Sequence, residues 1–520
     1  MATKLSVRQA FAFVLVTIYF LIAITGFYQP SALWLLVPVV PLHLVYWQNI
    51  RQGRHTLLRN YPLVGYLRYF FESIRPELRQ YFFESDTDGK PFSRRQRSIV
   101  YQRAKNVRQT VPFGMQSDSQ QTGHEWIAHT LFPVRVEEED LRVSIGSSSC
   151  QQPYSASIYN ISAMSYGSLS KTAISALSGG AKLGGGAQNT GEGGVSPYHL
   201  EGGGDLIWQI GTGYFGCRNE QGDFCERLFR EQALHPHIKM VELKLSQGAK
   251  PGHGGLLPAL KNTPEVAAIR KVRPHTTVAS PPGHSAFHDQ LSLLFSIEKM
   301  RLLSNGKPIG IKLCIGNKQE FERLCQEMMH SRIYPDFITI DGAEGGTGAA
   351  PLEFTDSLGM PLYDALAFAH TMLLKYGLRK EIKIMAAGKI ITGADIVKAI
   401  ALGADVCYSA RGMMFALGCI QALQCDSGRC PVGIATQDKR LSQGLDVADK
   451  RVRVASFHRN TLAATKELME ACGFQSLQDI TPDKIFRRVE QGSIKSFQQL
   501  YFGKTDSGRA REIFHNYKLN

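Results

Sequence analysis

The sequence predicts an α/β fold, a (β/α)8 TIM barrel with an N-terminal transmembrane helical hairpin and a short helical C-terminal extension. Three observations lead to this prediction. Residues 9–50 contain no Asp, Glu, Lys or Arg. Across residues 144–440, short β-type runs and Gly-rich loops alternate with helical stretches, a repetition typical of a parallel barrel. Residues 441–520 return to helical patterns, at 452–472 and 481–489.

The uncharged N-terminal stretch, assigned to residues 1–50, is long enough for two spans of about 20 residues each. A break at 26–31 divides it into predicted spans 10–25 and 33–47. The positive-inside rule places both ends in the cytosol, because basic residues flank the stretch on both sides: Lys4, Arg8, Arg51, Arg54 and Arg59. A cleaved signal peptide is the competing interpretation. Pro38 and Pro41 leave a re-entrant or surface helix open for the second span.

Residues 51–143 are predicted to form a basic, mainly helical connector. Residues 51–108 carry 13 Lys/Arg against 5 Asp/Glu. Directly after an apolar segment, this charge favours contact with membrane lipid over nucleic acid, and a solvated basic linker is the alternative. Apolar and basic residues mix at helical spacing in 61–80. This pattern predicts either a helix near the membrane face or an ordinary packing helix.

The barrel segment contains eight expected strands and several expected helices. The strands are 158–164, 186–189, 206–211, 240–245, 309–314, 337–340, 382–386 and 406–409, and the helices include 171–179, 318–328, 362–376 and 394–402. In such barrels, functional residues gather at the carboxyl ends of the strands. The Gly-rich loops after the last two strands, 387–393 and 409–412, suit a phosphate held by backbone N–H groups. Glycines needed only for tight turns are the alternative.

Lys312 lies in the fifth expected strand. A cation there could stabilise the reduced, anionic ring of a flavin, and a salt-bridged core lysine is the alternative.

Three of the ten cysteines are clustered, with the spacing Cys419-x5-Cys425-x4-Cys430-Pro431. Structural zinc sites normally use four ligands in closely spaced pairs. Three thiolates ending in Cys-Pro better fit a cubane-type cluster that lacks one iron, although zinc and buried free thiols stay open. The other cysteines are scattered, which indicates a reducing compartment rather than a disulfide scaffold.

Several motifs follow one another in the barrel segment. They are Ser-Ala-Met-Ser-Tyr-Gly-Ser at 162–168, Asn-Thr-Gly-Glu-Gly-Gly at 189–194, Gln-Gly-Ala-Lys-Pro-Gly at 247–252, Ser-Pro-Pro at 280–282, Gly-Gly-Thr-Gly at 345–348 and Cys-Pro-Val-Gly-Ile-Ala-Thr-Gln at 430–437. With these motifs, residues 144–440 resemble the FMN-binding synthase domain of the glutamate synthase family. The hairpin and basic connector resemble a membrane-anchored bacterial subgroup, which implies a bacterial inner membrane location with a cytosolic catalytic domain.

The resemblance implies a glutamate synthase-type oxidoreductase acting on CH–NH2. Reduced FMN, fed by a [3Fe-4S] cluster on Cys419, Cys425 and Cys430, would give a hydride to 2-iminoglutarate, made from 2-oxoglutarate and ammonia, to form L-glutamate. By position, the FMN-binding residues would be Ala163, Met164, Ser165, Lys312, Gly346, Gly388, Ser409, Arg411 and Gly412. The catalytic and substrate-binding residues would be Glu192, Lys244, Gln247, Lys250 and Arg273.

Departures from the family pattern shape the expected partners. The sequence has no room for the family's glutaminase domain, so ammonia is expected from solution or from a glutaminase partner. No Gly-x-Gly-x-x-Gly unit follows a strand, so electrons are expected from ferredoxin or an NAD(P)H-oxidising subunit. Val195 stands where the family has Glu.

Two other functions remain open. A membrane-linked flavin dehydrogenase could use the same cofactors to oxidise an amino or hydroxy acid and reduce quinone. A non-catalytic assembly subunit is the third hypothesis.

Overall fold

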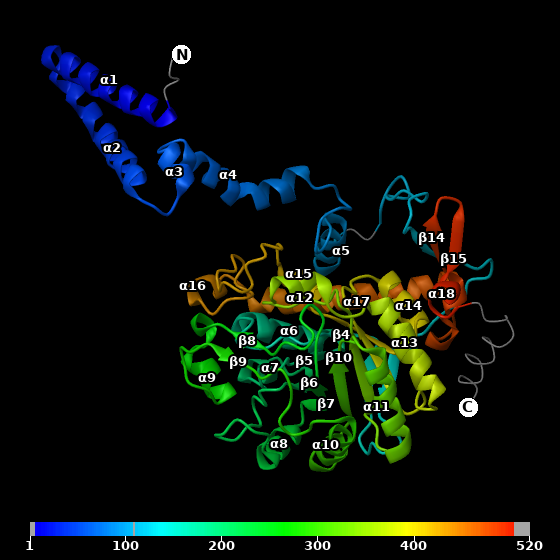
Figure 1. The fold of residues 1–520 in the computed structure, drawn as a ribbon. Coiled ribbons are helices and arrows are strands. Elements are labelled where there is room, and N and C mark those ends of the chain that lie inside the picture. The colour runs from blue at the N-terminus through cyan, green and yellow to red at the C-terminus, as the bar shows by residue number, and fades with distance from the viewer. Residues whose placement is uncertain (1–5, 108–109, 504–520) are drawn as a thin grey trace. The chain divides into compact units, whose positions relative to one another are not determined.

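The computed structural model describes residues 6–107 and 110–503, and the chain divides into two compact units, Met1–Arg95 and Gln96–Asn520 (Figure 1). The N-terminal unit is helical. Its elements are α1 (Val7–Tyr28), η1 (Pro30–Leu35), α2 (Leu36–Arg51), α3 (Thr56–Asn60), α4 (Gly65–Leu78) and the π-helical turn η2 (Arg79–Phe83). The helix predicted at 61–80 is confirmed as α4, which begins after Pro62 and continues into η2.

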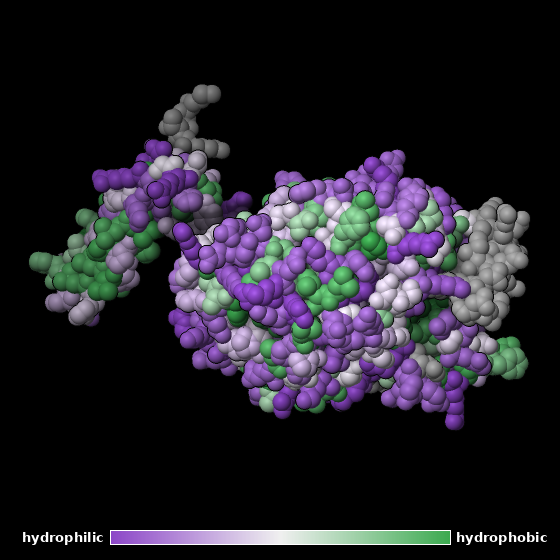
Figure 2. Space-filling view, turned by 90° about the horizontal axis from the view of Figure 1, so that it is seen from below, coloured by the Kyte–Doolittle hydropathy of each residue, from purple (hydrophilic) through white to green (hydrophobic). Residues whose placement is uncertain are grey.

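The hairpin of α1 and η1–α2 has a small core formed by Leu15, Tyr46 and Ile50. Its apolar side chains otherwise face outward, as the green surface of the hairpin in Figure 2 shows. By length and composition, Val7–Tyr28 and Pro30–Arg51 could each cross a membrane, and a signal sequence near the N-terminus passes the same test.

The second unit contains a closed barrel of eight parallel strands that follow one another in chain order. They are β4 (Tyr159–Ile161), β5 (Ala187–Asn189), β6 (Asp205–Ile210), β7 (Ile238–Lys244), β10 (Ile309–Leu313), β11 (Phe337–Asp341), β12 (Lys383–Ala387) and β13 (Val406–Ser409). All eight predicted strands are thus confirmed, as are the four helices α6 (Lys171–Gly184), α11 (Lys318–Ser331), α13 (Leu362–Lys375) and α14 (Gly393–Ala401).

Further helices lie between the barrel strands or follow the last of them, and surround the barrel (Figure 1). They are α7 (Pro197–Glu201), α8 (Glu226–Ala233), η4 (Ala259–Lys261), α9 (Pro264–Arg270), α10 (Gln290–Leu303), α12 (Leu352–Ser357), α15 (Arg411–Leu417) and α16 (Lys439–Ser442). A small antiparallel pair, β8 (Leu256–Leu257) and β9 (Val278–Ala279), lies in the long connection after β7.

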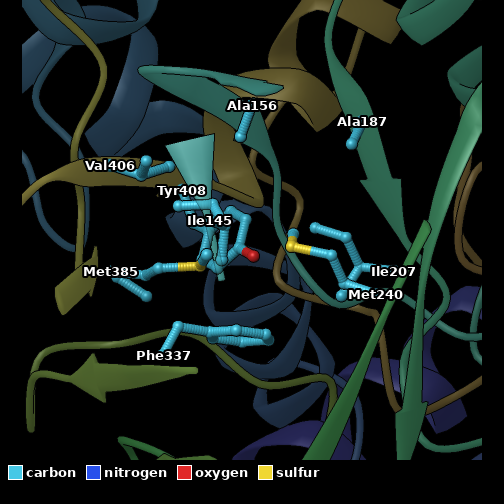
Figure 3. Close-up of a cluster of buried hydrophobic side chains, with 10 residues drawn as sticks. Ile145, Ala156, Ala187, Ile207, Met240, Phe337, Met385, Val406 and Tyr408 are labelled. Carbon is cyan, nitrogen blue, oxygen red and sulfur yellow. The ribbon is translucent and has the colours of Figure 1, made fainter. Parts of the chain in front are cut away.

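The barrel interior changes from apolar to polar along the strands. Its amino-terminal half is filled by a buried cluster, shown in Figure 3, and is closed by the antiparallel hairpin of β2 (Arg142–Ile145) and β3 (Tyr154–Ser157). Alternate side chains along a strand point to the same face. A strand residue that lies in this cluster therefore shows which later residues of that strand also point into the barrel. On β7, the inward-pointing residues are Met240, then Glu242, then Lys244. The polar side chains of this strand thus lie towards its carboxyl end.

The C-terminal extension is only partly helical. The helix predicted at 452–472 is confirmed as α17 (Val447–Cys472), which packs closely on α6: a Cβ added at Gly180 would lie 2.5 Å from Val454 Cγ1. The prediction of a helix at 481–489 is wrong. Its residues include β14 (Ile485–Glu490), which pairs with β1 (Glu125–Ile127) and β15 (Ser493–Ser496).

The local pattern of residues 481–489 misled the prediction because the strand's partner lies far away in the sequence. Arg487 of β14 and Glu125 of β1 form an ion pair of 2.7 Å across the two strands. Long-range pairing of this kind overrides a weak local preference. The remaining short elements are α5 (Arg94–Ala104), η3 (Glu139–Leu141), η5 (Leu477–Asp479), η6 (Pro482–Lys484) and α18 (Phe497–Tyr501).

His458 should make the second unit sensitive to acid. Its Nε2 donates to the carbonyl oxygen of Tyr159 at 2.7 Å, and burial lowers its pKa from 6.5 to about 4. As the pH falls from 6.5 to 4, the unfolded chain therefore binds a proton that the folded chain does not bind. We expect this group to remove about 3 kcal/mol from the free energy of unfolding over that window.

Urea unfolding at pH 6.5 and pH 4 tests this expectation. The acid-induced loss should be smaller in His458→Gln than in the unmodified protein, and unchanged in the control His288→Gln, whose side chain is exposed. Equal losses in the two variants would contradict the prediction.

Candidate active site at the carboxyl end of the barrel

An ion pair between Glu192 and Lys244 lies at the carboxyl ends of β5 and β7. Lys244 Nζ is 2.9 Å from Glu192 Oε1, and both side chains are largely buried. Gly255 leaves room for the carboxylate, because any larger residue would place its Cβ only 2.7 Å from Glu192 Oε1. The close approach of the backbone thus helps to hold the carboxylate in place.

Three cations control the ionisation of Glu192. Burial by itself would raise the pKa of this carboxyl, but Lys244, Lys250 and Arg270 together hold the pKa below its ordinary value. Glu192 is therefore a carboxylate at neutral pH, able to accept a proton without being a strong base.

Arg270 and Lys250 are buried next to this pair. Arg270 Nη2 donates to Tyr166 O at 3.1 Å, and the guanidinium lies 5.0 Å from the ring centroid of Phe215. Lys250 Nζ donates to Gly254 O at 3.2 Å. Burial lowers the pKa of Arg270 to about 10, and burial and Lys244 lower that of Lys250. Among the residues that the structure describes, neither cation forms an ion pair within 4 Å.

A second charged group lies deeper in the barrel. Lys312 points inward from β10, and its Nζ is 3.0 Å from Asp341 Oδ2 at the end of β11. Burial by itself would lower the pKa of Lys312, but Asp341, Glu242 and Glu192 hold it above its ordinary value. Glu242 is fully buried and accepts three hydrogen bonds, from Asn189 Nδ2, Gln209 Nε2 and Thr339 Oγ1.

The site has more positive than negative formal charge. The cations Lys244, Lys250, Arg270 and Lys312 face the carboxylates Glu192, Glu242 and Asp341. Buried charges are costly unless paired, so the excess positive charge, with Arg270 and Lys250 lacking an ion pair within 4 Å among the described residues, favours an anionic ligand. Carboxylate groups suit this arrangement because guanidinium and ammonium groups bind them through charge-assisted hydrogen bonds.

The loops predicted to hold FMN lie at the same end of the barrel, because each follows the carboxyl end of a parallel strand. Residues 163–165 follow β4 and pack tightly on the loop after β5, where a Cβ at Gly191 would lie 2.7 Å from Ser165 N. Gly388 follows β12 with φ +152°, and Ser409 ends β13. Small residues at these positions allow a flat ring and a phosphate to approach the backbone.

Arg411 connects two of these loops. Its Nη2 donates to the carbonyl oxygen of Thr347, and a Cβ at Gly346 would lie 2.9 Å from its Nε. Gly412 is equally crowded, because a Cβ there would lie 2.5 Å from Ser409 Oγ. A cation between two Gly-rich loops fits the phosphate of a flavin mononucleotide.

Comparison with known proteins identifies the family. Residues 116–475 match the family described as "Conserved region in glutamate synthase". The chain belongs to the glutamate synthase family. It is 38% identical to the glutamate synthase large subunit-like protein YerD of Bacillus subtilis, over 89% of this chain and 96% of that protein.

Other relatives in the glutamate synthase family are longer. The archaeal-type glutamate synthase [NADPH] of Thermotoga neapolitana is 35% identical, over 61% of this chain and 60% of that protein. The glutamate synthase [NADPH] large chain of Bacillus subtilis is 32% identical, over 62% of this chain but only 20% of that protein. The match to these relatives thus covers only part of their length.

The structure brings most of the predicted site residues together, but not Arg273. Glu192, Lys244 and Lys250 cluster as described, and Gln247 is half-buried in the loop after β7. The side chain of Arg273 is exposed, and Arg270 lies beside Glu192 instead.

Arg270 and Arg273 differ in burial because α9 ends between them. The helix ends at Arg270, and Lys271 takes a left-handed conformation with φ 54° that redirects the chain.

Glu242 and Asp341 also belong to the charged site, although neither was predicted from the sequence. A signal for Glu242 was present, because Glu242 and Lys244 alternate with apolar residues in one buried strand. Asp341 ends the sixth barrel strand, the position where this fold places functional residues.

The cysteine loop of this glutamate synthase-family chain carries the three thiols that were predicted to hold a cluster. Cys419 and Cys430 are buried and Cys425 is half-buried. Burial raises the pKa of Cys419 to about 11, while the backbone N–H of Gln421 and the cation of Arg411 oppose this shift.

In the conformation described, no three His, Cys, Asp or Glu side chains of residues 6–107 and 110–503 are grouped to hold a metal ion. Near these thiols, Arg411 Nη1 lies 3.5 Å from Cys425 Sγ.

Proposed function

We propose that the barrel catalyses the reductive amination of 2-oxoglutarate to L-glutamate, with FMN and a [3Fe-4S] cluster. The observation that supports this most is the pair of buried cations, Arg270 and Lys250, beside the Glu192–Lys244 ion pair. A dicarboxylate would pair directly with both cations, whereas a neutral substrate would leave the excess positive charge of the site uncompensated.

The chain's own residues have distinct roles in this proposal. Arg270 and Lys250 bind the carboxylates of the substrate. Glu192, ionised at neutral pH, accepts a proton from the incoming nitrogen at a carboxylate oxygen, while Lys244 holds that carboxylate in position.

The cofactors would be held by residues already described. FMN, when bound in the loops at 163–165, 346, 388 and 409–412, would supply the hydride, and Lys312 would offset negative charge on its ring. Cys419, Cys425 and Cys430 would hold the cluster, which provides one-electron transfer.

The partners and the location belong to the same proposal. Ammonia comes from solution or a glutaminase partner, and electrons come from ferredoxin or an NAD(P)H-oxidising subunit. The charge-free hairpin and the basic residues around it support anchoring in a bacterial inner membrane with the barrel in the cytosol. The hairpin also favours a second candidate, an amino or hydroxy acid dehydrogenase that reduces a membrane quinone.

One anaerobic experiment separates the two candidates. The purified protein, loaded with FMN and reduced, is mixed with 2-oxoglutarate and ammonium, and flavin absorbance and glutamate are measured. We expect reoxidation of the flavin with formation of glutamate. Absence of both would refute the proposal, and flavin reduction by glutamate with a quinone as acceptor would favour the second candidate.

Cys425→Ser should lose the cluster. One of three thiolate ligands would be replaced by a hydroxyl, which binds iron poorly. We expect the brown colour and the iron content to fall to background, as measured by absorbance and iron analysis. Cys150→Ser is the matched control, since Cys150 is also half-buried and is far from the loop in sequence. Full iron content in Cys425→Ser would disprove the assignment.

A further inference from the structure

Helix α4 carries an apolar stripe that is largely exposed among the residues that the structure describes. Leu67, Phe70, Phe71, Ile74 and Leu78 follow the spacing i, i+3, i+4, i+7 and i+11, which places them on one face of a helix. In a soluble domain such a face is normally buried. Here Leu67, Phe70 and Phe71 are 56%, 55% and 56% exposed.

The aromatic surface continues past the helix into η2. Tyr81, Phe82 and Phe83 are all exposed, the two phenylalanines at 77% and 79%. Exposed apolar patches of this kind mark interaction sites. Aromatic side chains are enriched where protein meets the boundary between lipid headgroups and acyl chains.

The polar residues of α4 suit the same boundary. Arg68 and Glu72 pair with each other on the other side of the helix, at 3.0 Å. Arg75 and Arg79 flank the stripe and are exposed. Long basic side chains can keep their charge in water while their stems cover apolar surface. The segment follows the charge-free hairpin along the chain, with only the short helix α3 between α2 and α4, so a lipid surface is the partner that this order favours.

We propose that α4 and η2 form an interfacial helix that lies in the plane of the membrane, with the stripe of Leu67, Phe70 and Phe71 among the acyl chains. The segment thus makes a contact with the bilayer that is separate from the spanning hairpin. This inference does not depend on the reaction that the barrel catalyses.

Tryptophan quenching by lipids brominated on their acyl chains tests the proposal in the full chain. Trp34→Phe and Trp47→Phe remove the fluorophores of the hairpin. Phe71→Trp then reports on the stripe, and Tyr69→Trp, on the opposite side of α4, is the matched control. Phe71→Trp and Tyr69→Trp each replace one aromatic residue by another, and circular dichroism verifies folding.

In vesicles of phosphatidylcholine and phosphatidylglycerol, we expect Phe71→Trp to be quenched at least about twofold more than Tyr69→Trp. Leu67→Trp, a second reporter on the stripe, should behave like Phe71→Trp. Equal quenching at 69 and 71 would overturn the proposal. Absence of quenching at both would also overturn it.

Discussion

Replacing Arg270 with Gln should weaken binding of 2-oxoglutarate by about 100-fold, whereas Arg273→Gln should change it by less than about twofold. Arg270 is buried beside Glu192 without an ion-pair partner among the residues described. A charge-assisted contact in such a place contributes on the order of 3 kcal/mol. Arg273 is exposed, where screening makes a comparable contact weak.

Isothermal titration of the FMN-loaded protein with 2-oxoglutarate measures both dissociation constants. Arg270→Lys keeps the charge but not the planar fork, so it should recover only part of the affinity. If Arg273→Gln proved to be the damaging substitution and Arg270→Gln the neutral one, the site described here would be wrong.

Lys312→Met should destabilise the barrel and abolish FMN binding. The substitution removes the cation that faces Asp341 and Glu242, both of which are buried. Removing one partner of a buried ion pair leaves an uncompensated charge and costs about 3–5 kcal/mol. The free energy of unfolding in urea and the flavin content after purification are the measurements.

A surface lysine provides the matched control for Lys312. Lys299 pairs with Glu226 at 2.9 Å, with both side chains more than half exposed. Lys299→Met should therefore cost less than about 1 kcal/mol. Adding Asp341→Leu to Lys312→Met should restore part of the lost stability, because no lone carboxylate remains at that position. Equal costs for Lys312→Met and Lys299→Met would contradict the buried pair.

The barrel could be predicted because its signals are local. Each strand is a short apolar run next to a Gly-rich turn, and each helix between strands has its own periodicity. Parallel strands place their carboxyl ends together, so Glu192, Lys244, Lys250 and Lys312 could be assigned to one site before any contact was known. Residues 485–490 could not be assigned in this way, because a strand with a distant partner has little local signal.

The sequence by itself therefore determined the order of eight strands, the charge-free hairpin and the strand-end loops in which functional residues were expected. The tertiary structure alone decided that Arg270 rather than Arg273 faces Glu192, and that Glu242 and Asp341 balance Lys312. The reason is that burial and pairing of charges depend on segments far apart in the chain. The chain turns at the left-handed residue Lys271, between the buried Arg270 and the exposed Arg273.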